Sequence, residues 1–543
     1  MSGFNLADLF ERVVDAAPER EVIVSPARRL TYRELDDRAN ALAAVLTGLG
    51  VTAGDHIGLQ LLNGSEYLEG MLAAFKLSAV PININFRYVE AELRHLYDDA
   101  DLVAVIYHRQ FADRVATAAA GAATLEHLID VDDGSRGASG GIDYEEALGA
   151  ATTNRPDSSN RSGDDRYIAY TGGTTGLPKG VVWRQEDIFF AAMGGGDVFQ
   201  SGNFIATPDE LLERMPEVGG TILTTPPLMH VSAQWGVFHS LFAGGRIVFA
   251  PHGPFDAGRI WSLVAAEGVN ILTIVGDAMA QPLADAIAAA NEAGTPYDVS
   301  SLFVIGSGGA VLSSAAKGRL AELIPTIMVV DGFGSSETGV VGSKLHVSGD
   351  TSTAPKFTVN AQTQVLGEDG HPVTPGSGEV GRLARKGHVP IGYYKDEVKT
   401  KATFLEVDGE RWVLPGDNAT VDEDGTVVLL GRGSTSINTG GEKVYPEEVE
   451  TALMTSPDVA DVIVVGLPDE RWGQRVVAVV AASPGCSPDL ESLRAHSRTT
   501  LAGFKLPREL IVVDAIERTP AGKADYKWAR ATAEAQTASK ATG

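Results

Sequence analysis

Residues 170–180 read "YTGGTTGLPKG", a run of small and hydroxyl-bearing residues that ends in a lysine. The flanking stretches, 167–170 and 181–183, have the aromatic and β-branched composition of short strands. A loop with so little side-chain bulk can close its backbone N–H groups around an anion, and Lys179 adds a positive charge. We therefore predict that this loop binds a large anion such as a polyphosphate.

The loop does not match the phosphate loop of P-loop NTPases, G-x-x-x-x-G-K-[ST]. Pro178 precedes Lys179 where that motif has glycine, and Gly180 follows it where the motif has Ser or Thr. The chain also continues into apolar β-branched residues rather than a helix. A flexible surface turn remains the alternative for this stretch taken alone, so the rest of the chain has to decide.

Length and charge restrict the class of protein. A chain of 543 residues exceeds one ordinary core, so two or more domains are expected. Its 44 Lys and Arg against 71 Asp and Glu give a net charge of −27, which disfavours nucleic acid and anionic membranes as partners. The charge of a polyphosphate ligand must then be met locally, by basic side chains, backbone N–H groups and a metal.

Cysteine content and hydropathy indicate the compartment. The single cysteine, Cys486, excludes a disulfide scaffold and a cysteine-based zinc site. Residues 1–20 have the pattern of an acidic amphipathic helix rather than a signal peptide, and no run of about 18 apolar residues occurs. We expect a cytoplasmic protein without stable membrane insertion; a homodimer is left open.

Strand-like and helix-like segments alternate along most of the chain, which predicts an α/β protein with mostly parallel sheets. After Gly431 a helix, two strands and a further helix indicate a small α+β domain, and residues 531–543 are expected to be weakly structured. Helices are predicted over 30–51 and 65–80, and strands over 56–62, 102–107, 221–227, 244–250, 270–275 and 301–308.

Four later stretches carry polar residues in turn-like settings. They are "DGFGSSETG" (331–339), "WVLPGDNATVDEDG" (412–425), "GRGSTSINTGGEKVYPEEVE" (431–450) and "RTPAGKADY" (518–526). Each alone is compatible with an ordinary structural turn, and Lys523 alone with a solubilising surface lysine. Together with residues 170–180, in this order and spacing, they resemble the adenylate-forming superfamily of acyl-CoA synthetases, luciferases and peptide-synthetase adenylation domains. The resemblance extends from about residue 30 to Lys523.

The resemblance implies a large N-terminal domain with several subdomains (1–431), a hinge (432–434) and a small, mobile α+β C-terminal domain (435–543). The family's hinge position usually holds Asp or Lys, whereas here it is Ser434. A hinge role for a charged side chain is therefore in doubt, and Gly433 supplies the backbone freedom instead.

The resemblance also implies the site residues. Glu337 would hold Mg²⁺, Ser336 would contact the α-phosphate, and Lys523 would offset the charge that develops when the acid attacks that phosphate. Phe333 replaces the usual tyrosine beside the adenine, and Asp417 would accept the ribose hydroxyls. The implied ATP- and CoA-binding residues are Thr171, Gly173, Thr174, Thr175, Lys179, Gly308, Gly309, Ala310, Asp331, Gly332, Phe333, Asp417, Arg432, Gly440 and Gly441.

The implied reaction links a carboxylate to AMP with release of pyrophosphate, and a thiol then displaces AMP. Family members use two orientations of the small domain, one that brings Lys523 to the first step and one that opens a thiol channel along Gly440 and Gly441. His230 would border an apolar tunnel for the acid, with a core role for this histidine as the alternative. Trp235 and Phe238 are candidates for the tunnel wall, and Gly195 and Gly339 would leave room within it.

The acid and the acceptor are less determined. No acidic residue lies beside His230 to hold an α-ammonium group, which disfavours an amino acid, although Asp197 is a caution. No carrier domain follows Lys523, which favours free CoA. The stretch 170–189 resembles actinobacterial ligases of steroid side chains; a medium- or long-chain fatty acyl-CoA ligase, an acyl-AMP ligase serving a separate carrier protein, a luciferase-like oxygenase and a catalytically dead regulator are the alternatives.

Overall fold

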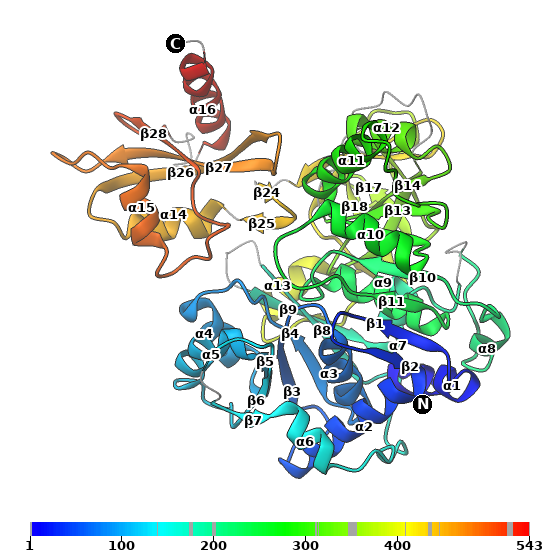
Figure 1. Cartoon of the computed structure of the whole chain (residues 1–543). Coiled ribbons are helices and arrows are strands. Elements are labelled where there is room, and N and C mark those ends of the chain that lie inside the picture. Colours follow the sequence, from blue (N-terminus) through cyan, green and yellow to red (C-terminus); the bar gives the residue numbers. More distant parts are fainter. Residues whose placement is uncertain are drawn as a thin grey trace.

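The structure is a computed structural model, and it divides into a large domain and a small C-terminal domain (Figure 1). It describes residues 3–137, 140–172, 178–197, 202–309, 312, 314–345, 356–407, 409–432, 437–444, 446–517 and 525–541. The large domain runs from blue to yellow in Figure 1, and the small domain is orange to red.

The first sheet of the large domain has eight strands. Its parallel part runs β8-β4-β3-β5-β6-β7, and β9 and β19 extend it in antiparallel fashion beyond β8. The strands are β3 (His56–Gln60), β4 (Val80–Asn83), β5 (Leu102–His108), β6 (His127–Val131), β7 (Ile142–Asp143), β8 (Arg166–Gly172), β9 (Pro178–Arg184) and β19 (Gly392–Tyr393).

The second sheet has fifteen strands among the described residues, and its parallel run is continued by antiparallel strands. The parallel run is β1-β11-β10-β12-β13-β14, with β2 at its edge. Its strands are β1 (Glu21–Val24), β2 (Arg29–Thr31), β10 (Thr221–Thr224), β11 (Arg246–Val248), β12 (Ile271–Ile274), β13 (Val304–Ser307) and β14 (Met328–Ser335). The antiparallel part contains β15 (Gly339–Leu345), β16 (Lys356–Val359), β17 (Thr363–Leu366), β18 (Gly381–Lys386), β20 (Phe404–Val407), β21 (Glu410–Val413), β22 (Asp417–Val421) and β23 (Val427–Arg432).

Helices cover both faces of each parallel run, as expected for buried parallel sheets. The largest core joins both sheets through α1 (Leu6–Ala16), α2 (Tyr32–Gly48), α3 (Ser65–Lys76), α7 (Gln185–Ala192) and α9 (Val231–Phe242). Outer layers are formed by α4 (Glu90–Asp99) and α5 (Ala112–Ala119) on the first sheet, and by α10 (Ala257–Glu267), α11 (Gly276–Glu292) and α12 (Ser314–Leu323) on the second. The remaining helices are α6 (Tyr144–Ala150), α8 (Glu210–Arg214) and α13 (Glu397–Thr403).

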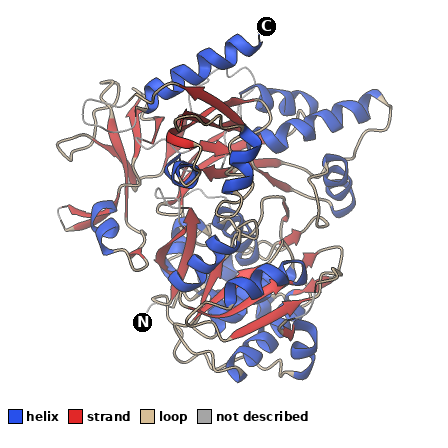
Figure 2. Ribbon diagram, turned by 90° about the vertical axis from the view of Figure 1, so that its left-hand side faces the viewer, coloured by secondary structure: helices blue, strands red, loops and turns tan. Residues whose placement is uncertain are grey.

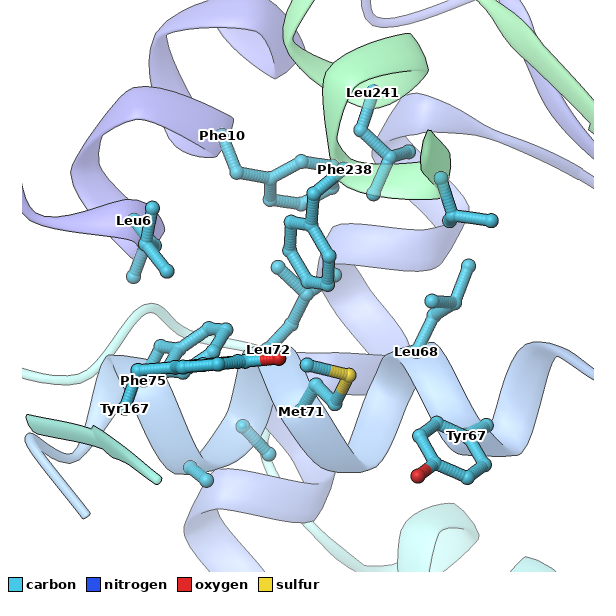
Figure 3. Close-up of a cluster of buried hydrophobic side chains, with 14 of the residues drawn as sticks. Leu6, Phe10, Tyr67, Leu68, Met71, Leu72, Phe75, Tyr167, Phe238 and Leu241 are labelled. Carbon is cyan, nitrogen blue, oxygen red and sulfur yellow. The ribbon is translucent and has the colours of Figure 1, made fainter. Parts of the chain in front are cut away.

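Figure 3 shows the centre of the largest core, where Phe75 of α3 meets Phe238 of α9 with ring centroids 5.8 Å apart. Local sequence signals mark where the helices around this core start. Thr31 and Glu34 form a capping box at the start of α2, which satisfies two free backbone donors. No helix among the described residues has both the length and the hydropathy to cross a membrane.

The small domain is an α+β unit around a five-stranded sheet (Figure 2). Its elements are β24 (Ile437–Thr439), β25 (Glu442–Val444), α14 (Pro446–Met454), β26 (Val459–Asp469), β27 (Gly473–Ala482), α15 (Leu490–Ser497), β28 (Glu509–Val513) and α16 (Tyr526–Ala541). The expectation of a weakly structured C-terminus is wrong up to residue 541, because α16 buries Ala529 and Ala533 against the sheet.

The predicted α/β class is therefore confirmed, and the predicted strands and helices are found within a few residues of their expected bounds. The stretch 170–180 differs in detail. Strands β8 and β9 pair as far as Gly172 and Pro178, so Lys179 lies on a strand, opposite Thr171. Residues 173–177, which include Gly173, Thr174 and Thr175, lie outside the described part of the chain.

Candidate active site

Lys179 is held by a carboxylate that the sequence analysis did not single out. Strand β19 pairs with β9, which brings the segment 392–396 alongside Lys179. Asp396 Oδ2 accepts a hydrogen bond from Lys179 Nζ at 2.6 Å, and both side chains are about three-quarters buried. Lys179 is the largest cause that lowers the pKa of Asp396. The lysine is thus aimed by a counter-charge at the base of the predicted phosphate loop.

Asp396 is fixed by a second role of its side chain. It is the N-cap of α13, and its Oδ1 accepts the backbone N–H of Lys399 at 2.9 Å. The two carboxylate oxygens therefore have separate partners, one in the helix and one in the predicted ATP site. An N-cap aspartate before a helix is visible in the sequence, but nothing local indicates that it faces Lys179, 217 residues away.

Glu337 lies in the turn between β14 and β15 and is oriented by the same segment. Tyr393 OH donates a hydrogen bond to Glu337 Oε1 at 2.8 Å. Trp183 of β9 donates from Nε1 to the backbone carbonyl of Ser336 at 2.9 Å. Segment 392–396 and strand β9 therefore both reach the predicted metal-binding and phosphate-binding groups.

A buried arginine supports this turn from behind. Arg385 of β18 is 2% exposed, and its guanidinium donates to the carbonyls of Thr338, Val340 (2.7 Å) and Ala191 (3.5 Å). Burial lowers its pKa to about 10. Removing it would take a donor from each of these carbonyls, and a buried carbonyl left without any donor costs about 1–3 kcal/mol. Arg385 thus links the Glu337 turn to the end of α7.

The predicted nucleotide wall lies at adjacent strand ends. Gly308 and Gly309 follow β13, and Gly332 lies on the neighbouring β14. Lys317 Nζ binds Asp331 Oδ2 at 2.9 Å, and burial still raises the pKa of that carboxyl. Ala310 lies outside the described residues.

Two further predicted nucleotide residues lie in the antiparallel part of the second sheet. Phe333 packs against Phe357 with ring centroids 5.2 Å apart, so part of its ring serves the core of that region. Asp417 is buried at the start of β22, in register with position 432 of β23. Their roles toward adenine and ribose stay predictions.

The small domain reaches the large one through the hairpin β24–β25. Gly440 and Gly441 form its two-residue turn with φ values of 59° and 83°, a conformation that glycine adopts readily. A Cβ at Gly441 would lie 2.4 Å from Val275 Cγ1, at the end of β12. The turn therefore requires glycine both for its backbone and for its close approach to the large domain.

Glu442, the first residue of β25, is buried against two bases of the large domain. His230 Nε2 lies 3.2 Å from Glu442 Oε1, and Arg87 donates to the same oxygen at 2.7 Å. Burial favours the protonated form of Glu442, but His230 and Arg87 outweigh it and lower its pKa. His230, which the sequence analysis placed beside the acid, is the N-cap residue of α9 and lies where the two domains meet.

The predicted walls of the acid tunnel are packed more tightly than expected. Phe238 points into the core (Figure 3), and Trp235 is buried in the same cluster. Gly195 has a φ of +56°, and a Cβ there would lie 2.8 Å from Phe190 and Phe204; at Gly339 it would lie 2.7 Å from the carbonyl of Ala191. These glycines are explained by backbone geometry, so acid binding by Trp235, Gly195 and Gly339 stays a prediction.

A pocket does lie at the other end of α9 from His230. It is bordered by α7, α8 and α9 and is lined by Met193, Gly196, Leu211, Met215, His239, Phe242 and Ala243. Position 239 is nine residues beyond 230, a rise of about 13.5 Å along the helix. The pocket has room for about one water molecule, so it is a small packing gap at the far end of α9 and not a space for the acid.

Family models match most of the chain. Residues 10–394 match the model described as AMP-binding enzyme, and residues 448–523 match the AMP-binding enzyme C-terminal domain. The chain belongs to the AMP-binding enzyme family. The superfamily resemblance seen in the sequence is confirmed, and the two matches agree with a large N-terminal and a small C-terminal domain.

Curated relatives cover almost the whole chain. A 3-oxocholest-4-en-26-oate–CoA ligase of Rhodococcus rhodochrous is 46% identical over 97% of this chain and 95% of its own length. A medium/long-chain-fatty-acid–CoA/3-oxocholest-4-en-26-oate–CoA ligase of Mycobacterium tuberculosis is 45% identical over 98% of this chain and 97% of its own. The amide bond synthetase McbA of Marinactinospora thermotolerans has the same fold, with a TM-score of 0.78 at 22% identity over 96% of this chain and 99% of its own.

The structure thus brings Lys179 and Glu337 to one segment, and His230 to the Gly440–Gly441 hairpin of the small domain. Lys523 lies outside the described residues, as does Ser434 of the predicted hinge. Arg432 ends β23, the last described strand before the small domain. The domain boundaries 1–431, 432–434 and 435–543 stay predictions.

Tyr393→Phe tests the alignment of Glu337. The change removes one hydrogen bond to a carboxylate, worth about 1.5–3 kcal/mol, and keeps the ring. We expect the Mg²⁺ concentration for half-maximal acyl-adenylate formation to rise about tenfold, measured by pyrophosphate release. Tyr394→Phe is the matched control, because Tyr394 OH binds Asp101 Oδ2 at 2.7 Å on the adjacent position. Equal Mg²⁺ titrations for the two variants would contradict the role given to Tyr393.

Proposed function

We propose that the protein is an ATP-dependent acid–CoA ligase, which converts a carboxylic acid to an acyl-AMP with release of pyrophosphate and then to an acyl-CoA thioester. What carries the proposal is the meeting of the two domains. The hairpin around Gly440 and Gly441 reaches the start of α9, beside the residues predicted to hold the acid. The two curated relatives named above are CoA ligases, and their similarity to this chain covers nearly their whole length.

In the first step ATP lies against Lys179 and Glu337. Lys179 Nζ has three donors, so it binds phosphate oxygens while Asp396 keeps it aimed. Mg²⁺ is commonly held by one or two carboxylates together with substrate phosphates, so Glu337 and the triphosphate form an adequate donor set. When bound there, the ion would neutralise charge on the phosphates.

CoA binds on the small domain beside the hairpin. The guanidinium groups of Arg471 and Arg508 lie over the ring of Trp472, at 4.8 and 4.5 Å from its centroid. The Trp472 carbonyl accepts the N–H of Gly440 at 2.8 Å, which ties this cluster to the hairpin turn. In a chain with a net charge of −27, two arginines on an aromatic face suit an anionic nucleotide, here the phosphates and adenine of CoA.

The acid is a steroid side-chain carboxylate. The carboxylate lies near His230, at the N-terminal end of α9. A rigid fused-ring body loses fewer rotors on binding than a flexible chain and gains about 25 cal/mol per Å² of buried apolar surface. The names of the two curated relatives support the same acid. We expect the reaction to occur in the cytoplasm, which supplies ATP and CoA.

The substrate preference is tested by kcat/KM for 3-oxocholest-4-en-26-oate, octanoate and palmitate with ATP and CoA, with products identified by mass spectrometry. We expect the steroid acid to have the highest value. A preference of about tenfold or more for octanoate or palmitate, a difference of about 1.4 kcal/mol, would instead establish a fatty acyl-CoA ligase. A fatty acyl-CoA ligase is the second candidate function, because the name of the Mycobacterium tuberculosis relative includes medium- and long-chain fatty acids.

The acceptor is tested in the same assay. Formation of acyl-AMP without any thioester from free CoA would contradict the ligase proposal and point to a separate carrier protein as acceptor. Substitution of Gly195 is unsuitable for probing the substrate, because a side chain there meets Phe190 and Phe204 before it meets any ligand.

A further inference from the structure

A buried lysine joins the two domains next to the hairpin. Lys505 of the small domain binds Glu92 of α4, in the large domain, at 2.6 Å. It also binds Glu448 of α14, in its own domain, at 2.8 Å. The exposed fractions of the Lys505, Glu92 and Glu448 side chains are 3%, 5% and 8%, so all three charges are removed from water.

The surroundings favour the charged form of Lys505. Lys505 Nζ lies 5.2 Å from the ring centroid of Tyr88, in the large domain, and 5.7 Å from that of Phe504. Burial alone would lower the pKa of Lys505, but Glu448 and Glu92 outweigh it and raise that pKa. Both carboxylates thus contribute to the charged form of Lys505, and either one leaves the lysine with an anionic partner.

Only one of the two carboxylates belongs to the opposite domain. Glu448 moves with Lys505 in any orientation of the small domain, whereas Glu92 stays with α4. A buried charge is expensive unless it is paired, so the contact between Glu92 and Lys505 contributes only while the domains remain as they are here. The same orientation places Glu442 against His230 and Gly441 against Val275.

Lys505 lies apart from the groups that act on substrate. Its side chain contacts Glu92, Glu448 and the rings of Tyr88 and Phe504. Glu92 has a separate structural role, because its Oε2 accepts the N–H of Val89 at the start of α4 at 3.1 Å. The orientation of the small domain is thus stabilised by an ion pair whose direct contacts lie outside the hairpin, although the charge of Lys505 also helps to lower the pKa of Glu442 within it.

We propose that Glu92 and Lys505 form an inter-domain latch, which stabilises the orientation in which the hairpin of residues 437–444 lies at His230. The consequence for catalysis rests on the proposed function: the latch serves thioester formation, the step that uses the hairpin and CoA, and is dispensable for acyl-adenylate formation. Glu92 and Lys505 are positioning residues in this scheme.

The position of the small domain is measured directly, without reference to catalysis. Spin labels are attached to Cys486, the single native cysteine, and to an introduced cysteine at Val218, which is 83% exposed in the large domain. We expect a narrow distance distribution for the otherwise unchanged protein and a second, shifted population for Glu92→Gln. Glutamine can still accept the Val89 N–H, so α4 keeps its cap.

The two half-reactions are then assayed separately on Glu92→Gln. Thioester formation from pre-formed acyl-AMP and CoA should fall about tenfold, within the usual range of coupling between sites, while pyrophosphate release in the first turnover is unchanged. Lys505→Met should lower the rate of thioester formation further, because it leaves the Glu92 and Glu448 carboxylates close together without a cation in this orientation.

Two matched variants separate the latch from general damage. Glu34→Gln changes the capping box of α2, where Glu34 Oε2 accepts the Thr31 N–H at 2.7 Å, and should leave both half-reactions unchanged. Glu448→Gln removes the carboxylate that moves with Lys505 and should leave the label distances unchanged. Label distances and thioester rates in Glu92→Gln equal to those of the parent protein would overturn the latch. A shifted distance in a protein that forms no thioester with any acid would keep the latch and refute the proposed function.

Discussion

Replacement of Lys523 by alanine is expected to slow acyl-adenylate formation by about 10²–10³-fold, the usual loss when one preorganised charge-stabilising donor is removed. Attack of the carboxylate on the α-phosphate concentrates negative charge on both groups, and a lysine between them offsets it. Thioester formation from pre-formed acyl-AMP should be spared, because the charge at that step develops on the acyl oxygen instead. Rapid-quench measurement of each half-reaction checks both expectations.

The control for Lys523 lies four residues later. Lys527 is exposed in the first turn of α16, where Asp525 caps the N–H groups of Lys527 and Trp528 at 3.1 and 3.0 Å. Lys527→Ala removes a positive charge from the same part of the chain and should leave both half-reactions intact. Equal losses in both half-reactions of Lys523→Ala would indicate misfolding and contradict the assigned role.

Ser434→Pro is expected to have the opposite selectivity. Strand β23 ends at Arg432 in the large domain and β24 begins at Ile437 in the small one, so the chain crosses between domains in the residues between them. Proline would restrict φ to about −65° at the predicted hinge and hinder rotation of the small domain. We expect first-turnover pyrophosphate release to survive and CoA-dependent turnover to fall on the order of 100-fold.

Ser434→Ala is the matched control, because it removes the hydroxyl and leaves the backbone free. Its steady-state CoA ligation should equal that of the parent protein. Normal CoA ligation in the proline variant would show that the rotation occurs at other residues. Lys523→Ala is thus expected to impair acyl-adenylate formation alone, and Ser434→Pro to impair CoA-dependent turnover alone.

Much of the fold was predictable because the relevant signals are local. Helix α2 starts at a capping box formed by Thr31 and Glu34, which are adjacent to it in the sequence. The β-branched runs around 102–107 and 270–275 form β5 and β12. The C-terminal helix was missed because an Ala-rich, polar segment has weak periodicity. Burial of Ala529 and Ala533 against the small sheet stabilises it.

The predicted tunnel illustrates the limit of reading glycines from sequence. A glycine signals either free space or a special backbone conformation, and the letters are the same in both cases. Gly195 and Gly339 both have a positive φ, and a Cβ at either position would lie less than 3 Å from a neighbouring atom. These two glycines therefore reflect a special backbone conformation and not free space. Phe238 similarly has the composition of a pocket wall, yet it faces Phe75 in the core.

By itself the sequence determined the α/β class, the membership of the AMP-binding enzyme family and the reaction expected of it, because motif residues keep their order and spacing along the chain. Only the tertiary structure decided which groups position the predicted ones: Asp396 on Lys179, Tyr393 on Glu337, Arg385 behind the turn, and Glu92 on Lys505. The physical reason is that each of these contacts joins residues far apart in the chain, through strand pairing or domain docking. A hydrogen bond acts only within about 3 Å in space, whatever the separation in sequence.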